Sequence, residues 1–305
     1  MSEPTVPPPA SRPVAGILWM LVTGLCFVAV TGIVKHVGQD MPAPQAAFLR
    51  FVLGLVFLIP VLPALMRLRL DRRGWALYSV RSALHVVGVL CWFHAMTQIP
   101  VAEVTAMNYL APVYVTIGAA LFLGEKLAAR RILAVAAGLL GAALILRPGF
   151  REVSDGHLAM LVTALMFGGS FLIAKRLSEM HDAGTVVAML SVMVPVGLAP
   201  FALAVWVTPT LTQLAWLMLV AAFATAGHYA MTRAFAAAPV TVTQPVTFLQ
   251  LVWATLLGIF VFGEPADGWV ILGGSVILAA VSFIGWREAT LKRQRVTPPP
   301  EATKL

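Results

Sequence analysis

Charged side chains are scarce in this sequence: Asp, Glu, Lys and Arg make up only 11% of its 305 residues. A soluble globular domain carries about 25% of such residues. Hydrophobic residues make up 60% of the chain, and the mean hydropathy is +0.89. The shortage of charge excludes an ordinary soluble fold and places the chain among integral membrane proteins.

Cysteine is almost absent as well. The two cysteines, Cys26 and Cys91, both lie inside apolar runs, which excludes a disulfide framework and a cysteine-based metal site. The formal net charge is +8, but the basic residues occupy short gaps between apolar runs, so the charge does not indicate nucleic-acid binding. A phosphate-binding loop is also missing. We therefore expect no cofactor, no metal and no nucleic-acid partner.

What the sequence does contain is an internal repeat. Residues Pro100–Glu125 (PVAEVTAMNYLAPVYVTIGAALFLGE) recur as Pro239–Glu264 (PVTVTQPVTFLQLVWATLLGIFVFGE), at a constant shift of 139. Each copy holds an apolar run long enough to cross a bilayer as a helix, which takes about 20 residues. Because internal repeats decide architecture before other features, we expect two similar halves.

Ten apolar segments of suitable length divide the chain, and the fold class is all-α, a polytopic membrane protein. We expect spans at Val14–Val34, Ala43–Met66, Trp75–Ile99, Val101–Leu123, Ile132–Leu146, Leu158–Ala174, Thr185–Val207, Leu214–Phe235, Val240–Phe262 and Trp269–Trp286. The first repeat covers residues 14–148 and the second residues 156–288. Residues 1–13 form a Pro-rich disordered N-terminal tail, and residues 289–305 form a basic, Pro-rich C-terminal tail.

The two halves are expected to be inverted. Gly16 and Lys35 flank the first span, and Gly156 and Lys175 flank the sixth at a shift of 140. Because each half has five spans, an odd number, the second half enters the membrane upside down. Inverted repeats are typical of secondary transporters, whose binding site lies near the bilayer midplane between the repeats.

The distribution of basic residues predicts the orientation. With the N-terminus inside, the inner segments hold sixteen Lys and Arg residues and the outer segments hold three, Lys35, Arg147 and Arg151. Because cytoplasmic loops carry the excess of Lys and Arg, we expect a multi-pass protein of a bacterial-type inner membrane with both termini in the cytoplasm.

Several residues resemble one known family. They are Arg50 and Phe51 in the second span, then Pro100, Pro112, Glu125, Gly138 and Gly141, then Pro239 and Glu264. On these the sequence resembles the drug/metabolite transporter superfamily, in its ten-helix EamA branch, over residues 14–288. The resemblance implies transport of small metabolites through a central cavity surrounded by spans one to four and six to nine, with spans five and ten peripheral.

Three segments are similar to a narrower group. The segment around His85, the Ile-Pro-Val sequence at residues 99–101 and the Leu-Arg-Pro-Gly sequence at residues 146–149 look like members that take up riboflavin or S-adenosylmethionine. The resemblance therefore implies a small-molecule substrate of that kind.

The third span is the most polar. Arg81, His85, Gly88 and Trp92 are spaced four, three and four residues apart, which places them on one helix face. A charge inside a membrane normally faces a cavity or a partner, so this face is a candidate surface for an anionic or polar substrate. The alternative for Arg81 is that it extends to the nearby membrane surface.

Arg50 lies about 10 Å inside the second span at 1.5 Å per residue. It is expected to face protein or water, either binding substrate or bonding backbone carbonyls between helices.

The fourth and ninth spans carry matched faces at the shift of 139. These are Thr105, Tyr109, Pro112 and Thr116, which correspond to Gln244, Phe248, Leu251 and Thr255. One aromatic ring in each half, beside hydroxyls and an amide, suits a flat polar ligand between the repeats. Hydrogen bonding between helices is the equal alternative. Pro112 and Pro245 remove backbone donors in mid-span and favour kinks.

Trp19, His228 and Tyr229 extend the candidate lining, with ordinary packing as the alternative for His228. Glu103 is the only carboxylate inside a span. It is either an interfacial acid or a proton-coupling group. Glu125 and Glu264 end their repeats, where each can face the N-terminus of the next helix.

The sequence therefore predicts a secondary transporter of a small polar metabolite that works by alternating access, with the lipid bilayer as its surroundings. An integral-membrane enzyme acting on a lipid-linked substrate is the alternative, but no paired carboxylates or nucleophile–base cluster supports it, so we do not expect an enzyme. A membrane scaffold is a further alternative, although the loops are too short to form a domain. Glycines 138, 141, 273 and 274 allow close helix contact, either within the bundle or in a homodimer.

Overall fold

The structure is a computed structural model, and it describes residues 12–66, 68–123, 129–150, 152–177, 180–181, 183–238 and 243–296. Within these ranges the regular structure is helical and contains no β-strand. Of the predicted tails, residues 1–11 and 297–305 lie outside the described residues, as do Glu125 and Pro239. Residues 289–296 belong to the helix Gly268–Val296, so the last helix extends eight residues beyond the predicted boundary at residue 288.

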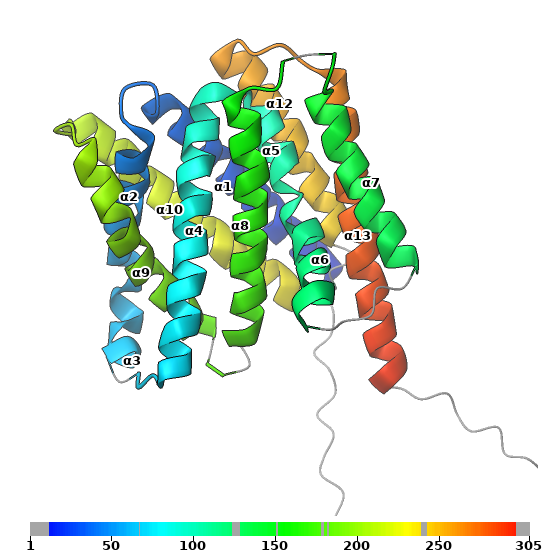
Figure 1. Cartoon of the computed structure of the whole chain (residues 1–305), viewed down its shortest axis with the longest axis horizontal. Coiled ribbons are helices and arrows are strands. Elements are labelled where there is room, and N and C mark those ends of the chain that lie inside the picture. Colours follow the sequence, from blue (N-terminus) through cyan, green and yellow to red (C-terminus); the bar gives the residue numbers. More distant parts are fainter. Residues whose placement is uncertain are drawn as a thin grey trace, which may run out of the picture.

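The first half of the chain contains the elements up to α7 (Figure 1). They are α1 (Pro13–Val37), α2 (Ala43–Gly54), the 3-10 helix η1 (Leu55–Val61), α3 (Leu62–Met66), α4 (Arg72–Gln98), α5 (Val101–Asn108), α6 (Ala111–Leu123) and α7 (Ala129–Leu146). The second half contains α8 (Asp155–Leu177), α9 (Ala183–Ala204), α10 (Leu211–Ala237), the 3-10 helix η2 (Gln244–Thr247), α12 (Phe248–Phe262) and α13 (Gly268–Val296).

Ten membrane crossings are present in the described chain, as predicted. Eight segments are long and apolar enough to span a bilayer as single helices, and the shorter apolar helix α12 supplies a ninth. The remaining crossing is made by α5 and α6 in succession. The predicted all-helical membrane fold is therefore confirmed.

The fourth crossing is broken where the sequence predicts a continuous span. α5 ends at Asn108, and α6 begins at Ala111. Pro112 explains the break, because a proline ring clashes with the carbonyl four residues earlier, which here belongs to Asn108. The corresponding place in the second half is also irregular, since the η2 segment that contains Pro245 is a 3-10 helix. In the described chain, the fourth crossing of each repeat thus departs from a regular α-helix near a proline.

Six contacts at one end of the bundle show that the halves are inverted. They are Lys35–Ile99, Asp40–Gln213, Gln45–Val207, Val101–Glu264, Glu103–His157 and Arg147–Asp267. At this end α1, α4, α7, α9 and α12 finish, whereas α2, α5, α8, α10 and α13 begin. Each helix of the first half therefore runs opposite to its counterpart in the second half. We call this end, formed by these twelve residues, the Lys35 face; it lies at the top of Figure 1.

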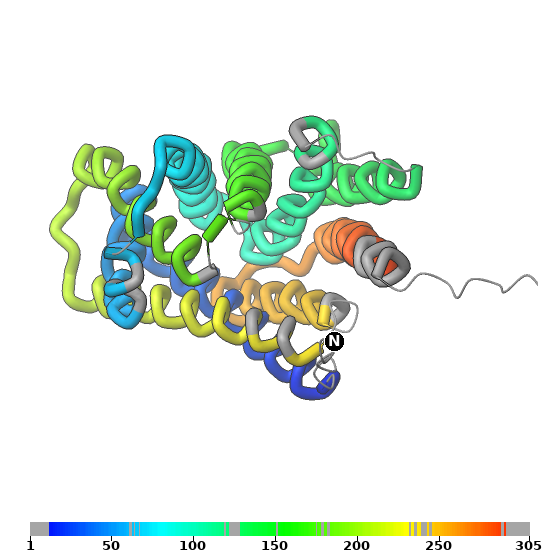
Figure 2. The backbone as a smooth tube through the Cα atoms, turned by 90° about the horizontal axis from the view of Figure 1, so that it is seen from below, coloured from blue at the N-terminus to red at the C-terminus, as the bar shows by residue number. Residues whose placement is uncertain are grey.

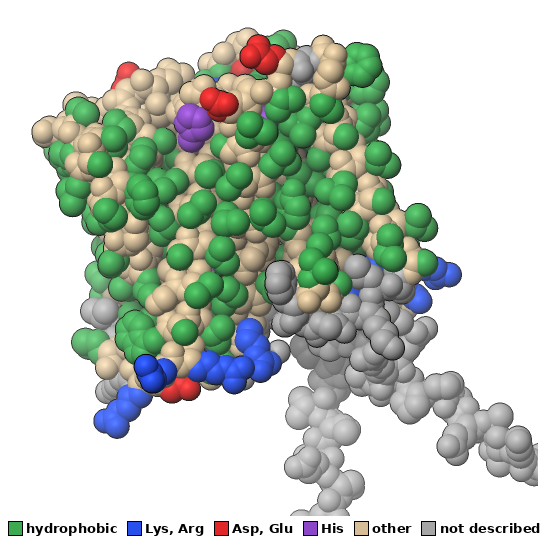
Figure 3. All heavy atoms as spheres, in the orientation of Figure 1, with side chains coloured by type: hydrophobic (Ala, Val, Ile, Leu, Met, Phe, Trp, Pro, Cys, Tyr) green, Lys and Arg blue, Asp and Glu red, His purple; other side chains and the backbone are tan. Residues whose placement is uncertain are grey.

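The opposite end carries basic residues, and we call it the Arg72 face. α4 starts there with Arg72 and Arg73, and α7 starts there with Arg130 and Arg131. Figure 3 shows Lys and Arg side chains gathered at this lower end, with hydrophobic side chains covering the surface above them. This arrangement is that of a bundle whose apolar belt lies in a bilayer.

The helices pack across the boundary between the repeats. α1 packs on α10, α4 on α8, and α7 on α13, and the end-on view in Figure 2 shows α7 and α13 together at one side of the bundle. Gly141 and Gly273 permit that last contact, because a Cβ on Gly141 would stand 2.7 Å from the carbonyl oxygen of Gly273. Gly138 and Gly274 likewise face neighbours inside the chain, Val113 and Leu251. The four glycines thus support the bundle.

Candidate functional site

Helices of both repeats surround a cavity of ≈ 440 Å³. Small-molecule sites usually measure about 300–1,000 Å³. The lining is mostly apolar, with polar side chains at a limited number of positions: Thr23, Thr31, Arg50, His85, Trp92, Thr105, Asn108, Tyr109, His228, Thr247 and Gln250. The arrangement therefore has the composition of a binding site, with apolar walls and a few polar groups that orient a ligand.

The two helices expected at the periphery differ from each other. The described residues of α7 contribute nothing to the lining, as expected, whereas α13 contributes Leu278 and Val281. α13 comes this close because Gly274 packs against Ala106 of α5, where a Cβ would stand 3.0 Å away. Span ten is thus part of the cavity wall, which corrects the expectation from the resemblance.

Arg50 supplies the charge in the cavity. Its guanidinium carbon lies 4.4 Å from the centre of the Phe51 ring. No hydrogen bond or ion pair joins Arg50 to another residue in the part of the chain that the structure describes, and the described lining contains no carboxylate. The predicted bonds to backbone carbonyls are thus not formed there. A cation in a site that partly excludes water interacts strongly with an anionic or electron-rich group.

His85 is held among aromatic rings. Its imidazole lies 4.9 Å from the ring of Phe167 and 6.2 Å from the ring of Phe51, measured between ring centres. The Oγ atom of Ser170 lies 3.5 Å from Nδ1 of His85. These contacts place a flat, polar ring against the cavity, on the side formed by α2, α4 and α8.

His228 occupies the other side of the cavity. Its ring packs edge-on against Phe27, with centres 5.1 Å apart, and thereby joins α10 to α1. Gly227 permits this approach, because a Cβ there would lie 3.1 Å from that of Cys26. The cavity thus has an aromatic pair on each side, which suits a flat ligand between them.

Polar groups near the helix breaks complete the lining. The hydroxyl of Tyr109 donates to the carbonyl oxygen of Thr247 at 3.1 Å and so joins the fourth crossings of the two repeats. Thr105 donates to its own helix, at the carbonyl oxygen of Val101. Asn108, the last residue of α5, is exposed toward the cavity that it lines. Its amide supplies both donors and acceptors to a ligand.

Five of the ten predicted site residues line the cavity: Arg50, His85, Trp92, Tyr109 and His228. Asn108, Gln250 and the aromatic residues Phe27 and Phe167 line it too, although the sequence analysis did not select them. For Asn108 the sequence does contain a signal, because this polar residue lies in mid-span, four residues before Pro112. Gln250 has alanine at the matching position of the first repeat, so a comparison of the two repeats does not identify it as a lining residue.

Arg81 is placed away from the cavity lining, although it shares a helix face with His85. Its side chain is buried, and Nη1 donates to the carbonyl oxygen of Val186 at 2.7 Å. The bond ties α4 to α9, which covers the outer part of that face. This finding corrects both expectations for Arg81, since the residue neither lines the cavity nor extends to the membrane surface.

Trp19 and Tyr229 also lie outside the lining. Their rings pack edge-on with centres 6.2 Å apart, and the guanidinium of Arg233 lies 5.6 Å from the first and 5.9 Å from the second. Tyr229 is 58% exposed. The three residues form a cation–π cluster on the outside of the α1–α10 pair.

Two remaining candidates come from the second repeat. Phe248 packs against the main hydrophobic core and is not part of the lining. Gln244 opens η2, but its side chain lies outside the described part of the structure. The predicted match of Tyr109 with Phe248 therefore does not produce a pair of rings in the cavity.

The two acidic residues highlighted in the sequence lie at the Lys35 face. Glu264 accepts a hydrogen bond from the backbone N–H of Val101 at 2.9 Å. It therefore faces a helix N-terminus, but that of α5 in the other repeat instead of the next helix. Glu103 is 3% exposed and lies 2.5 Å from His157. Glu103 is therefore a buried acid with a partner at this end of the bundle.

Comparison with known proteins agrees with the fold. A model of the EamA-like transporter family matches residues 14–147 and 154–286. A solved crystal structure of another protein has a TM-score of 0.58 at 17% identity, covering 93% of this chain and 99% of that chain. The family match confirms the resemblance to the drug/metabolite transporter superfamily, and the solved structure agrees with the fold.

Curated relatives carry transporter names. The chain is 31% identical over 300 residues to a riboflavin transporter of Rhizobium johnstonii, covering 97% of this chain and 98% of that protein. It is 29% identical to a riboflavin transporter of Vibrio cholerae, covering 93% and 97%. It is 24% identical to an S-adenosylmethionine uptake transporter of Rickettsia bellii, covering 92% and 97%.

Proposed function

The chain belongs to the EamA-like transporter family, and on that premise we propose that it is a secondary transporter that moves a small polar metabolite across a bacterial inner membrane by alternating access. The substrate occupies the cavity between the repeats, and both termini are cytoplasmic, so that the Lys35 face points outward. The inverted repeats support this mechanism, because rocking of one bundle against another around a fixed site exposes it to each side in turn.

The observation that carries the proposal is the position of Arg50. It brings a cation that has no hydrogen-bond or ion-pair partner among the described residues into a cavity whose described lining has no acid to balance it. Burying a charge without a partner costs free energy. A residue that served only for packing would not need this charge, so the position of Arg50 supports a role in binding. A ligand with an electron-rich edge recovers part of this cost when it binds.

The lining favours a flat heteroaromatic substrate, and riboflavin is our first candidate. The isoalloxazine ring of riboflavin is planar, and its carbonyl oxygens accept hydrogen bonds from groups such as Arg50 and Asn108. The aromatic rings around His85 and His228 provide surfaces on which such a ring stacks. The relatives named riboflavin transporters support this choice.

S-adenosylmethionine is the second candidate, because other relatives carry that name. Its sulfonium is a permanent cation, and like charges repel more strongly where water is excluded. Arg50 and the absence of an acid in the described lining therefore disfavour it relative to riboflavin.

The test is uptake by the purified protein in liposomes, with labelled riboflavin and labelled S-adenosylmethionine measured separately. We expect saturable riboflavin uptake that excess unlabelled riboflavin abolishes and S-adenosylmethionine leaves nearly unchanged. Uptake of S-adenosylmethionine alone would contradict the substrate proposal but keep transport. No saturable flux across a panel of anionic, neutral and cationic heteroaromatic metabolites would contradict the transporter proposal itself.

A further inference from the structure

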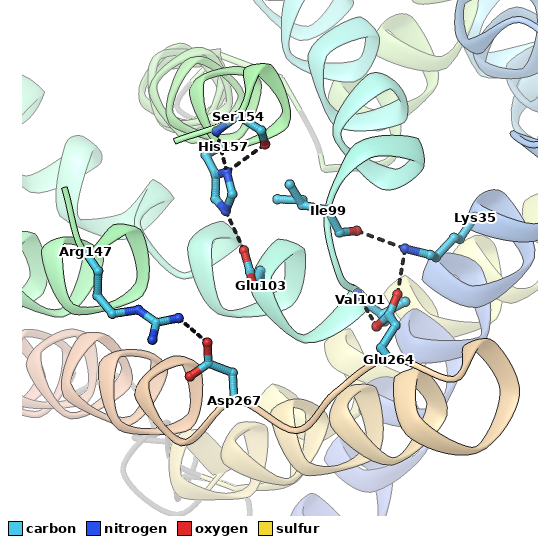
Figure 4. A network of polar contacts seen from close by, with 9 residues as sticks. All are labelled: Lys35, Ile99, Val101, Glu103, Arg147, Ser154, His157, Glu264 and Asp267. Atoms are coloured by element: carbon cyan, nitrogen blue, oxygen red, sulfur yellow. Dashed lines mark hydrogen bonds and ion pairs between the residues drawn. The ribbon is translucent and has the colours of Figure 1, made fainter. Parts of the chain in front are cut away.

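Helices α7 and α13 belong to different repeats, and they are joined unevenly along their length. At the Lys35 face, Arg147 directly after α7 forms an ion pair with Asp267 directly before α13 (Figure 4). Nearer the middle, Gly141 and Gly273 bring the two backbones into contact. Toward the Arg72 face, a groove lies between the two helices instead.

This groove has a volume of ≈ 270 Å³ and almost entirely apolar walls. Its lining consists of Arg130, Leu133, Ala134 and Ala137 from α7 and of Ala280 and Phe283 from α13. Leu133 is 69% exposed and Phe283 is 37% exposed, so the groove opens on the outside of the bundle. Metabolite sites usually measure about 300–1,000 Å³ and enclose most of their ligand. This smaller, open groove is better suited to the hydrocarbon chain of a lipid.

An arginine stands near the end of the groove on each helix. Arg130 lies eleven residues before Gly141 on α7, and Arg287 lies ten residues after Ile277 on α13. Gly141 is in contact with Ile277, and the two helices run in opposite directions. Both arginines are therefore displaced from that contact by about 15 Å toward the Arg72 face, at 1.5 Å per residue.

Arg287 continues the groove wall that α13 forms. Ala280, Phe283 and Arg287 are three and four residues apart, which places them on one helix face. The ring of Trp286 lies 6.0 Å from that of Phe283, measured between ring centres, and tryptophan is enriched at the depth of lipid head groups. Beyond this point the sequence of α13 adds one acid and three basic residues, Glu288, Lys292, Arg293 and Arg295. The mouth of the groove thus lies at a basic membrane surface.

The two arginines at this mouth have no protein partner among the residues that the structure describes. Neither Arg130 nor Arg287 forms a hydrogen bond or an ion pair there, in contrast to Arg147, which has Asp267. Because α7 begins at Ala129, Arg130 also lies in a first helical turn, where negative charge is favoured over positive charge. The mouth therefore has the charge that a phosphate requires.

We propose that the groove between α7 and α13 binds an anionic phospholipid from the leaflet at the Arg72 face. The lipid phosphate contacts Arg130 and Arg287, and one acyl chain occupies the apolar groove. A second copy of the chain is a poorer occupant, because a symmetric contact brings the same arginines together from both copies, and like charges repel. This site does not depend on the proposed transport function.

α13 separates the groove from the central cavity. Leu278 and Val281 line the cavity, whereas Ala280 and Phe283 line the groove. At 3.6 residues per turn these two pairs lie on nearly opposite sides of the helix. A lipid in the groove therefore supports the outer side of a cavity wall, and it joins the two repeats at the end that the Arg147–Asp267 pair does not reach.

Photocrosslinking tests the site on the purified full-length protein in detergent micelles. The probe is phosphatidylglycerol with a photoactivatable group in one acyl chain, and mass spectrometry identifies the modified peptides. We expect modification within residues 133–137 and 280–283. Unlabelled phosphatidylglycerol should compete at least about 5-fold better than phosphatidylcholine with the same chains, since one arginine near a membrane surface contributes about this factor. Equal competition, or modification only elsewhere, would overturn the proposal, as would competition by inorganic phosphate.

Two double variants separate the charge of the mouth from the general basic surface. In Arg130→Gln with Arg287→Gln the groove remains, so crosslinking should persist while the preference for phosphatidylglycerol disappears. The matched control is Arg72→Gln with Arg73→Gln, which removes two exposed arginines from the same face and should keep the preference. A preference that survives in the first variant, or that is lost equally in both, would contradict the assigned head-group contact.

A third variant tests the position of the acyl chain. Ala137→Phe fills the groove, so crosslinking of the two peptides should fall about 10-fold or more. Unchanged crosslinking in a monodisperse Ala137→Phe protein would show that the chain lies elsewhere and overturn the groove as its site. If this variant does not accumulate, the arginine variants at the membrane surface decide the question.

Thermal unfolding tests the support of α13. Phosphatidylglycerol should raise the thermal midpoint of the wild type more than phosphatidylcholine does, and the two lipids should act alike on Arg130→Gln with Arg287→Gln. If crosslinking behaves as expected but the midpoint of the wild type does not distinguish the lipids, the lipid binds without supporting the cavity wall, and that part of the proposal is wrong.

Discussion

The ammonium group of Lys35 lies 2.6 Å from the carboxylate of Glu264, and this ion pair joins the end of α1 to the end of α12. Both side chains are mostly buried, at 14% and 12% exposure. Lys35 also donates to Ile99, and Glu264 also accepts from Val101. The pair therefore holds the junction between α4 and α5 from two sides.

We predict that Lys35→Gln loosens the Lys35 face. Glu264 then keeps its bond to Val101 but loses the opposite charge that balances it, and an uncompensated charge is disfavoured in a partly buried site. A cysteine at position 31, which lines the cavity, should react with a membrane-impermeant reagent from outside about 10-fold faster, equivalent to about 1.4 kcal/mol. The double variant Lys35→Glu and Glu264→Lys exchanges the two charges. It should lower the reaction rate of this cysteine only part of the way to the rate without Lys35→Gln, because a lysine cannot accept the hydrogen bond from Val101. An unchanged rate in Lys35→Gln would contradict the role of the pair.

Arg50→Gln should weaken substrate binding while the protein still reaches the membrane. The amide keeps some hydrogen bonding but removes the charge, and we expect the apparent affinity to fall about 10-fold or more, which equals about 1.4 kcal/mol. Uptake kinetics and the amount of protein in the membrane are measured on the same cells. Arg72→Gln, at the exposed start of α4, is the matched control and should behave as the wild type. Normal affinity in Arg50→Gln would remove Arg50 from the binding site.

Arg81→Gln should lower the stability of the protein and leave substrate affinity unchanged, the reverse of the result expected for Arg50→Gln. Its bond to Val186 ties α4 to α9 outside the cavity, and hydrogen bonds of charged groups contribute about 1.5–3 kcal/mol to stability. We therefore expect a lower thermal midpoint and less protein in the membrane, with the substrate affinity of the remaining protein unchanged. A thermal-shift assay and an affinity measurement on the same purified protein distinguish a loss of stability from a loss of substrate binding. A selective loss of affinity would return Arg81 to the substrate site.

Orientation in the membrane can be tested by labelling cysteines in a background in which Cys26 and Cys91 are alanine. A cysteine at Asp40, on the Lys35 face, should react with an impermeant reagent in intact cells. A cysteine at Arg72 should react only after the membrane is permeabilised, because basic segments stay in the cytoplasm. The reverse pattern would mean that the Lys35 face is cytoplasmic.

Gly141→Val should destabilise the contact between α7 and α13. A Cβ at this position would lie 2.7 Å from both the Gly273 carbonyl oxygen and a side-chain carbon of Ile277, and overpacking typically costs about 1–3 kcal/mol. Gly268→Ala is the control, because nothing lies within 4 Å of a Cβ there. The thermal midpoint of the purified protein should fall for the first variant and not for the second. Equal midpoints would show that the two helices are not packed through Gly141.

The sequence predicts the crossings and their inversion well because both depend on properties that each segment carries by itself. Apolar length determines a span, and an odd number of spans determines the inversion. The break at Asn108 was harder to place, since Pro112 reveals a kink but not on which side of it the helix ends.

The candidate site was predicted in part, for a related reason. Helical spacing shows that Arg81 and His85 share a face, but it does not show that α9 covers the first and leaves the second at the cavity. Trp19 and Tyr229 pack on each other and Arg233, which only the pairing of α1 with α10 reveals. His157 stands outside the predicted spans, so its contact with Glu103 has no signal in the local sequence.

The broken fourth crossing has a mechanical consequence. α5 is a rod of only eight residues, held at its start by Glu264 and, just beyond its end, by the hydroxyl of Tyr109 on the carbonyl of Thr247. Both attachments belong to the segment around α12 in the second repeat. If the two repeats move against each other, we therefore expect α5 to move with the second repeat, although its sequence belongs to the first.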